Sequence, residues 1–138
     1  MHLDPSEQSG AALFRRNIKG PFLMLNLLRF RETADYSAFP ELAPLGPISG
    51  SAAYDLYVRH TAPFLAASGG SVELFGTGGP YFVGPAEERW DAVMLIRQAS
   101  VSDFFAFATN EGYLAGAGHR TAALEDSRLL PILERSLP

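Results

Sequence analysis

The stretch Phe22-Leu23-Met24-Leu25-Asn26-Leu27-Leu28-Arg29-Phe30 is the most apolar run of the chain, and it decides the fold. Gly20-Pro21 precedes it and a proline-rich segment follows, so the run predicts a strand with sharp ends. Side chains alternate along a strand, which places Phe22, Met24, Asn26, Leu28 and Phe30 on one side and Leu23, Leu25, Leu27 and Arg29 on the other. Because both sides are apolar, both faces of this strand need a cover.

Two less regular segments flank this strand. Before it, Asp4 to Asn17 predicts a helix that Asp4 or Ser6 caps, with Leu13 and Phe14 as its buried side. After it, the stretch from Arg31 to Ser51 contains three prolines, which exclude a long helix or a central strand. We expect an irregular excursion there.

The remaining segments alternate between helix and strand patterns. A helix from Ser51 to Ser68 carries one stripe made of Tyr54, Tyr57, Val58, Thr61 and Leu65, with a local kink expected at Pro63. Ser71 to Gly76 and Arg89 to Gln98 predict an antiparallel pair, with a turn region over Gly76 to Pro80. Further helices are expected over Val101 to Asn110 and Tyr113 to Glu125, and a last strand over Arg128 to Leu133.

The order strand, helix, strand, strand, helix, strand predicts an α+β fold of the ferredoxin-like, split βαβ type. In this fold a four-stranded antiparallel sheet carries its helices on one face. Residues 1–138 then form a single domain, with residues 1–20 as an N-terminal helical extension and residues 31–50 as the excursion. The other face of the sheet is open although its strands are apolar, so we expect a homodimer with sheets packed face to face.

Composition excludes several classes of function. The formal net charge of −4 makes nucleic acid an unlikely partner, and the absence of cysteine excludes disulfides, thiolate nucleophiles and Cys-type metal sites. No apolar run is long enough to span a membrane, and the first residues do not resemble a signal peptide, so we expect a cytoplasmic protein without membrane contact. The three histidines lack metal-ligand spacing, and we expect no metal.

Several motifs resemble the family named domain of unknown function 1330, of the dimeric α/β-barrel superfamily. Those that carry the resemblance are MLNLLRFRE at 24–32, YDLY at 54–57, ERWDAV at 88–93, Gly112-Tyr113 and AALEDSRL at 122–129. The resemblance implies the dimeric ferredoxin-like barrel but no activity, because this superfamily includes cofactor-free monooxygenases, isomerases, haem-degrading enzymes and members without known chemistry.

Asn26 and His119 are the candidate catalytic residues. Asn26 interrupts an apolar strand, so its amide must find a partner, either a neighbouring backbone group or a ligand. His119 is an imidazole beside a cation and can act as a base near neutral pH, whereas His60 is expected at the surface. The haem-degrading members of the superfamily place a haem-ligating histidine on the second helix of the fold, which here has none. We therefore expect no cofactor.

Five further side chains are candidates for ligand binding. Tyr54 and Tyr57 share a helix face, and core packing is the alternative role for both. Trp90 lies near the start of a predicted strand. It either lines the bottom of a ligand pocket, or packs in the core or in a dimer contact. Tyr113 and Arg120 are placed near one helix face, and the Arg120 guanidinium suits a carboxylate. The alternative role of Arg120 is an ion pair with Glu125, with Asp126 or with an acidic residue across a dimer.

Two functions from different classes follow. The first is a small cofactor-independent enzyme, similar to a monooxygenase or an isomerase, that acts on a small organic metabolite, with acids among the candidates, in a cleft between sheet and helices. The second is a non-catalytic dimer that binds a small molecule or has a structural role. A cleft with convergent polar groups favours the first, and a filled core favours the second.

Overall fold

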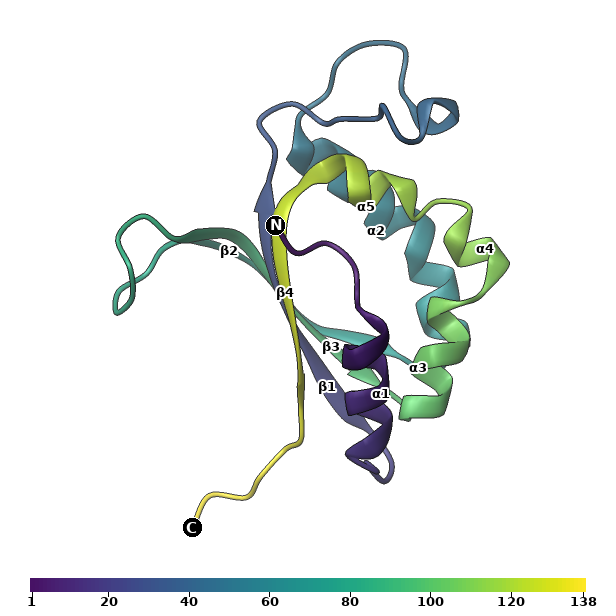
Figure 1. Ribbon diagram of the computed structural model, residues 1–138, viewed down its shortest axis with the longest axis vertical. Coiled ribbons are helices and arrows are strands. Elements are labelled where there is room, and N and C mark those ends of the chain that lie inside the picture. Colours follow the sequence, from purple (N-terminus) through teal and green to yellow (C-terminus); the bar gives the residue numbers. More distant parts are fainter.

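A computed structural model describes residues 1–138 and contains one antiparallel sheet of four strands, in the order β2-β3-β1-β4. The strands are β1 (Phe22–Phe30), β2 (Ser71–Pro80), β3 (Arg89–Gln98) and β4 (Leu124–Ile132). The helices are α1 (Glu7–Arg15), α2 (Gly50–Ala67), α3 (Val101–Ala108), α4 (Glu111–Leu114) and α5 (Gly118–Ala123), with one 3-10 turn, η1 (Pro40–Leu42). The helices lie on one side of the sheet (Figure 1), which confirms the ferredoxin-like α+β fold.

The apolar run decides the fold because it lies at the centre of the sheet. β1 pairs with β3 and with β4, so both of its edges are hydrogen-bonded. Phe22, Met24 and Leu28 are buried and pack in one cluster with Tyr54 and Leu65 of α2. These side chains form the side of β1 that the helices cover, as the alternation predicts.

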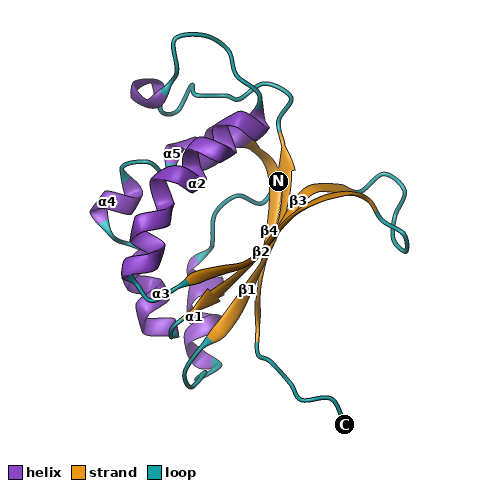
Figure 2. Ribbon diagram, turned by 180° about the vertical axis from the view of Figure 1, so that it is seen from behind, coloured by secondary structure: helices purple, strands orange, loops and turns teal.

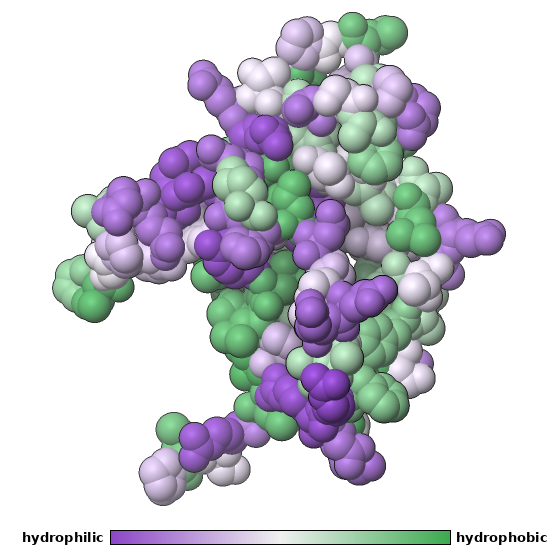
Figure 3. All heavy atoms as spheres, viewed as in Figure 1, coloured by the Kyte–Doolittle hydropathy of each residue, from purple (hydrophilic) through white to green (hydrophobic).

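The opposite face of the sheet carries an apolar row that nothing covers. The register places Leu25 of β1 beside Leu95 of β3 and Leu130 of β4, and Leu95 beside Leu74 of β2. Leu74 and Leu130 at the two ends of the row are 53% and 56% exposed, and the two central leucines are only half-buried. Apolar side chains gather on this side of the molecule, between the β2–β3 hairpin and the C-terminal segment (Figure 3).

The leading helix is shorter than the sequence predicts. Ser6 caps it and forms a capping box with Ser9, so α1 begins at Glu7 and not near Asp4. Leu13 is buried as expected, but Phe14 is 73% exposed, because only one side of the helix faces the sheet. α2 runs through Pro63 as one helix.

The excursion after β1 is irregular, as predicted, and its two ends are joined. Thr33 and Ser49 form an isolated β-bridge, and the Gly50 N–H donates to the carbonyl of Arg31. A Cβ on Gly50 would overlap the backbone oxygens of Arg31 and Ala123, which is why the chain has glycine where the excursion meets α2.

The predicted turn over Gly76 to Pro80 is wrong. β2 continues through these residues to Pro80 and pairs with β3 as far as Gly79 beside Trp90 and Pro80 beside Arg89. Glycine at position 78 allows β2 to approach β3 closely, because a Cβ on Gly78 would overlap the backbone of Trp90. The resulting hairpin is long and projects from the body of the molecule on the side away from the helices (Figure 2).

The predicted helix over Tyr113 to Glu125 is also wrong. The chain forms two short helices, α4 and α5, and enters β4 already at Leu124, four residues before the expected Arg128. Gly116 lies against the His60 ring and Gly118 against Phe39, so both glycines serve close packing and the chain changes direction between them. None of the helices has the length and hydropathy that a membrane span requires.

Candidate functional site

Three tyrosines and one arginine meet where α2, α4 and α5 face the sheet; we call them the Tyr–Arg cluster, made of Tyr54, Tyr57, Tyr113 and Arg120. The Tyr57 and Tyr113 hydroxyls are 2.9 Å apart and hydrogen-bonded. The rings of Tyr54 and Tyr57 are 5.3 Å apart, so the sequence spacing on α2 does place them on one face. The structure thus brings together four of the five predicted ligand-binding residues.

Arg120 is partly buried and has no acidic partner. The chain forms four ion pairs, which involve Arg89, Arg97 and Arg128. Arg120 is partly buried and donates instead to the backbone carbonyl of Leu3 and, at 3.2 Å, to the hydroxyl of Ser127. The predicted alternative of an ion pair with Glu125 or Asp126 is wrong within one chain, since Asp126 pairs with Arg128.

The N-terminal segment closes the β4 side of this cluster. His2 donates its N–H to Asp126 at 2.8 Å and accepts from Ser127, while the carbonyl of Leu3 accepts from Arg120. Burial acts to raise the pKa of Asp126, but the hydrogen bonds from His2, Arg128 and Ser127 outweigh it, so that the pKa is lowered. The segment is held through its main-chain atoms.

Burial is the main cause of the raised pKa values of the two tyrosines on α2. It raises the pKa of Tyr54 to about 12 and that of Tyr57 well above its ordinary value. The positive charge of Arg120 acts in the opposite direction on both pKa values. Both phenols are therefore neutral near pH 7 and can donate hydrogen bonds.

Asn26 finds its partner within its own strand. Its side-chain amide donates to the carbonyl of Met24 at 3.0 Å, as the backbone alternative predicts. Asn26 pairs in the sheet with Met94, whose sulfur accepts a hydrogen bond from the Tyr54 hydroxyl at 3.5 Å. Asn26 is therefore next to the Tyr–Arg cluster, but no hydrogen bond joins it to that cluster.

His119 lies away from Asn26, against the excursion. Its Nδ1 is 2.7 Å from the Tyr36 hydroxyl, and the two rings pack edge to face. Burial lowers the pKa of His119, and His60 acts in the same direction, so the imidazole is neutral near pH 7. Tyr36 also lines a pocket of about 350 Å³ within the excursion. No contact connects the two predicted catalytic residues.

His60 is not at the surface, contrary to expectation. It is partly buried, its Nε2 lies 2.8 Å from the carbonyl of Gly112, and its ring packs against Phe64. Its side chain joins α2 to α4.

Trp90 is buried apart from the other candidates, at the root of the β2–β3 hairpin. Its indole N–H donates to the Tyr81 hydroxyl at 2.7 Å. The guanidinium carbons of Arg29 and Arg128 lie 5.8 and 5.1 Å from its ring centroid, within the range of a cation–π contact. These contacts favour the structural alternative for Trp90, since every polar atom of the indole is already used.

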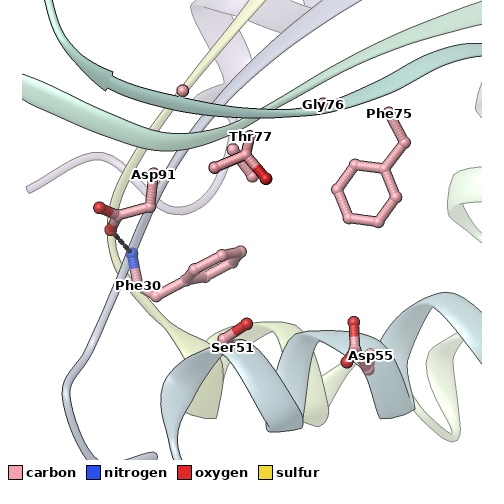
Figure 4. A pocket seen from close by; sticks show the side chains of 9 residues that line it. Phe30, Ser51, Asp55, Phe75, Gly76, Thr77 and Asp91 are labelled. Atoms are coloured by element: carbon pink, nitrogen blue, oxygen red, sulfur yellow. Dashed lines mark hydrogen bonds between the residues drawn. The ribbon is translucent and has the colours of Figure 1, made fainter.

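A second pocket has no counterpart in the predictions from the sequence. It measures about 490 Å³ and lies between α2 and the β2–β3 hairpin (Figure 4); we call it the α2–β2 pocket. None of the predicted site residues lines it. No sequence signal marks it, because its walls come from four separate elements and from the unpredicted part of β2. The lining residues are Phe30, Ser51, Asp55, Phe75, Gly76, Thr77, Gly78, Asp91 and Ala92.

These features define the class of protein: a ferredoxin-like α+β chain with a partly buried Tyr–Arg cluster under its helices. A solved structure described as a dimeric protein of unknown function with a ferredoxin-like fold, from Bacteroides fragilis, is 10% identical and covers 80% of this chain and 93% of its own, with a TM-score of 0.48. No known family profile matches the chain, and no curated protein does.

The particular family follows from two more similar structures. The crystal structure of RPA0582, a protein of unknown function from Rhodopseudomonas palustris, is 35% identical over 99% of this chain and 98% of its own, with a TM-score of 0.83. The crystal structure of methylated RPA0582 is 34% identical, covers 98% of this chain and 96% of its own, and has a TM-score of 0.84. The chain belongs to the same family as RPA0582.

Proposed function

We propose that this protein binds a small organic carboxylate at the Tyr–Arg cluster. The single observation that carries the proposal is the Arg120 guanidinium, which is partly buried beside two neutral phenols and has no carboxylate partner in the chain. A guanidinium recognises a carboxylate through two parallel hydrogen bonds, which are about twice as strong as neutral ones.

The hydrogen bonds of Arg120 support one position for such a ligand. One guanidinium nitrogen donates to the carbonyl oxygen of Leu3, which occupies the position that a carboxylate oxygen would take. The Tyr57 and Tyr113 hydroxyls share one hydrogen bond and retain acceptor and donor capacity for a second oxygen. The ligand therefore replaces the main chain of the N-terminal segment and lies between the guanidinium and the phenols.

A thermal-shift screen tests this proposal. We expect at least one of acetate, benzoate, phenylacetate and succinate to raise the melting temperature, because a ligand that binds only the folded state stabilises it by mass action. Arg120→Lys should weaken that acid about tenfold and leave the unliganded melting temperature unchanged, since lysine lacks the planar fork.

The matched control is Arg59→Lys. Arg59 is an exposed residue of α2 that forms no ion pair, so its substitution should change neither binding nor stability. A screen in which no acid stabilises the protein, or equal stabilisation of Arg120→Lys, contradicts the proposal. A drop in the unliganded melting temperature of Arg120→Lys assigns Arg120 to structure.

We also propose that the protein is a homodimer whose open sheet faces pack together. The support is the uncovered row Leu74, Leu95, Leu25 and Leu130, which crosses all four strands. Such a contiguous apolar row is rare on a monomer and typical of an interface, and a two-fold axis lets the same row serve both copies. Light scattering after size exclusion should give twice the chain mass, and a monomer at micromolar concentration would refute it.

A cofactor-independent enzyme is the second candidate, and one observation favours it. The neutral His119 imidazole is hydrogen-bonded to the Tyr36 phenol at 2.7 Å, beside the pocket that Tyr36 lines. A neutral imidazole can remove a proton from a substrate bound there, and Asn26 stays a second predicted catalytic residue. Solvent deuterium incorporation into a small organic substrate with an acidic C–H bond, lost in His119→Gln, tests this function.

We further propose that the family corresponds to domain of unknown function 1330 and that the protein is cytoplasmic. The MLNLLRFRE and AALEDSRL motifs support the first proposal, and they occupy β1 and the junction of α5 with β4. The absence of cysteine supports the second. Fractionation of cells that express the chain with an epitope tag tests the location.

A further inference from the structure

We propose that the α2–β2 pocket binds a small aromatic or alkyl amine as its ammonium ion. This site is separate from the carboxylate site proposed above, so neither depends on the other. Its volume of about 490 Å³ lies within the range of small-molecule sites.

Aromatic rings provide the apolar part of the pocket. Phe30 enters from the end of β1 and Phe75 from β2, and both rings point into the space above α2 (Figure 4). Phe75 is 48% exposed although it lies on the helix-covered side of its strand, because no helix reaches that far across β2. A ring or short alkyl group bound between Phe30 and Phe75 would remove this apolar surface from water.

The charge of the pocket selects a cation. Asp55 projects from α2 toward the pocket (Figure 4), and its carboxylate forms no ion pair and accepts no hydrogen bond. Asp91 lines the opposite wall, where it accepts from the N–H of Phe30 at 2.8 Å and pairs with Arg89. No lysine or arginine lines the pocket, so the carboxylate of Asp55 is the charge left without a counterion.

The donor set favours an organic ammonium over a metal ion. Only two carboxylates line the pocket, one of them already engaged, and no group of three or more His, Asp or Glu side chains in the chain is placed so that it could hold a metal ion. An ammonium needs one carboxylate and a few hydroxyl acceptors, which Ser51 and Thr77 supply, and it gains further attraction from the faces of Phe30 and Phe75. Asp55 is therefore the proposed anchor of the ligand.

The pocket would stay accessible in the proposed dimer. Its walls belong to α2 and to the side of the sheet that faces α2, whereas the apolar row lies on the opposite side. Two copies that pack through the row therefore leave the α2–β2 pocket facing solvent.

Isothermal titration with 2-phenylethylamine tests the proposal, and 2-phenylethanol is the neutral analogue of nearly the same shape. We expect one saturable site per chain for the amine and about two- to fivefold weaker binding of the alcohol, as expected for a solvent-exposed ion pair. Asp55→Asn keeps the shape of the side chain and removes its charge, and it should weaken the amine by a similar factor. Phe75→Ala should weaken amine and alcohol alike.

Glu41→Gln is the matched control, because it removes one negative charge from the exposed turn η1, outside the pocket. It should leave amine binding unchanged. Equal binding of amine and alcohol, unchanged binding by Asp55→Asn, or no saturable binding up to about 10 mM overturns the proposal. Because Asp55 is exposed and forms no ion pair, Asp55→Asn should fold normally, and its melting temperature checks this. A loss of amine binding can then be assigned to the missing charge.

Discussion

The two faces of the sheet contain the same kinds of residue but differ in what they contact. On one face, Phe22, Met24 and Leu28 are buried against α2 and join one core cluster. On the other, Leu25 of β1 and its neighbour Leu95 of β3 remain half-buried, with no helix above them. The strand sequence alone does not distinguish these faces. The comparison shows that an apolar pattern on a strand predicts that a face needs a cover. Which face the helices cover depends on the rest of the chain.

Truncation of the core should show the largest effect on stability. Leu28 is fully buried, so Leu28→Ala should lower the free energy of unfolding by about 2–5 kcal/mol through lost transfer energy and a residual cavity. Urea unfolding at one protein concentration measures it, and the same truncation on the other face, Leu25→Ala, should lower the free energy less. A larger loss at Leu25 would contradict the assignment of the two faces.

A charge in the middle of the open face should separate the proposed dimer. Leu95→Glu puts a carboxylate from each copy into the interface, where neither has a partner, so we expect the dimer dissociation constant to rise at least about a hundredfold. Sedimentation equilibrium measures it. Leu45→Glu is the control, because Leu45 is fully exposed in the excursion and its substitution should leave the association unchanged.

Removal of one hydroxyl in the Tyr–Arg cluster should have a smaller effect. Tyr57→Phe loses the 2.9 Å hydrogen bond to Tyr113, which is worth about 0.5–1.5 kcal/mol. Urea unfolding of Tyr57→Phe, Tyr113→Phe and the double variant should give a coupling energy of that size. Additive losses would show that the two hydroxyls do not interact in solution.

The smallest expected effect is the pH response of His119. Its lowered pKa means that the unfolded chain binds a proton in preference to the folded one once the pH falls below about 6.5. The contribution of the neutral imidazole to stability is therefore complete above that pH and is lost as the pH falls. Melting curves from pH 5 to 8 should fall less steeply for His119→Gln than for the wild type, and parallel curves would contradict the assignment.

The sequence predicts β1, β3 and α2 well, because their signals are local. The bounds of β1 and β3 agree with their predicted bounds, and the stripe on α2 is buried where expected, with Tyr54, Thr61 and Leu65 inside. Two of the errors lie at glycines. Gly76 to Gly79 look like a turn and Gly116 and Gly118 look like gaps in a helix, whereas the structure uses most of them for close approach of distant residues.

The candidate site was only partly predictable, because part of it depends on contacts between residues far apart in the sequence. Tyr54 and Tyr57 share a helix face by local spacing, but the contact of Arg120 with Leu3 joins residues 117 positions apart. The α2–β2 pocket depends on how far the helices extend across β2, a property of packing that no motif encodes. Whether the Tyr–Arg cluster binds a ligand stays a prediction.

The joined ends of the excursion make it a suitable place to graft foreign sequence. The bridge between Thr33 and Ser49 and the bond from Ala34 N–H to the carbonyl of Ile48 close the loop at its neck, and its outer part lies above the body of the molecule (Figure 1). Doubling the length of a flexible loop costs only about 0.6 kcal/mol in closure entropy. A peptide epitope inserted between Gly46 and Pro47 should therefore be displayed without moving β1 or α2, which turns this family into a small display scaffold.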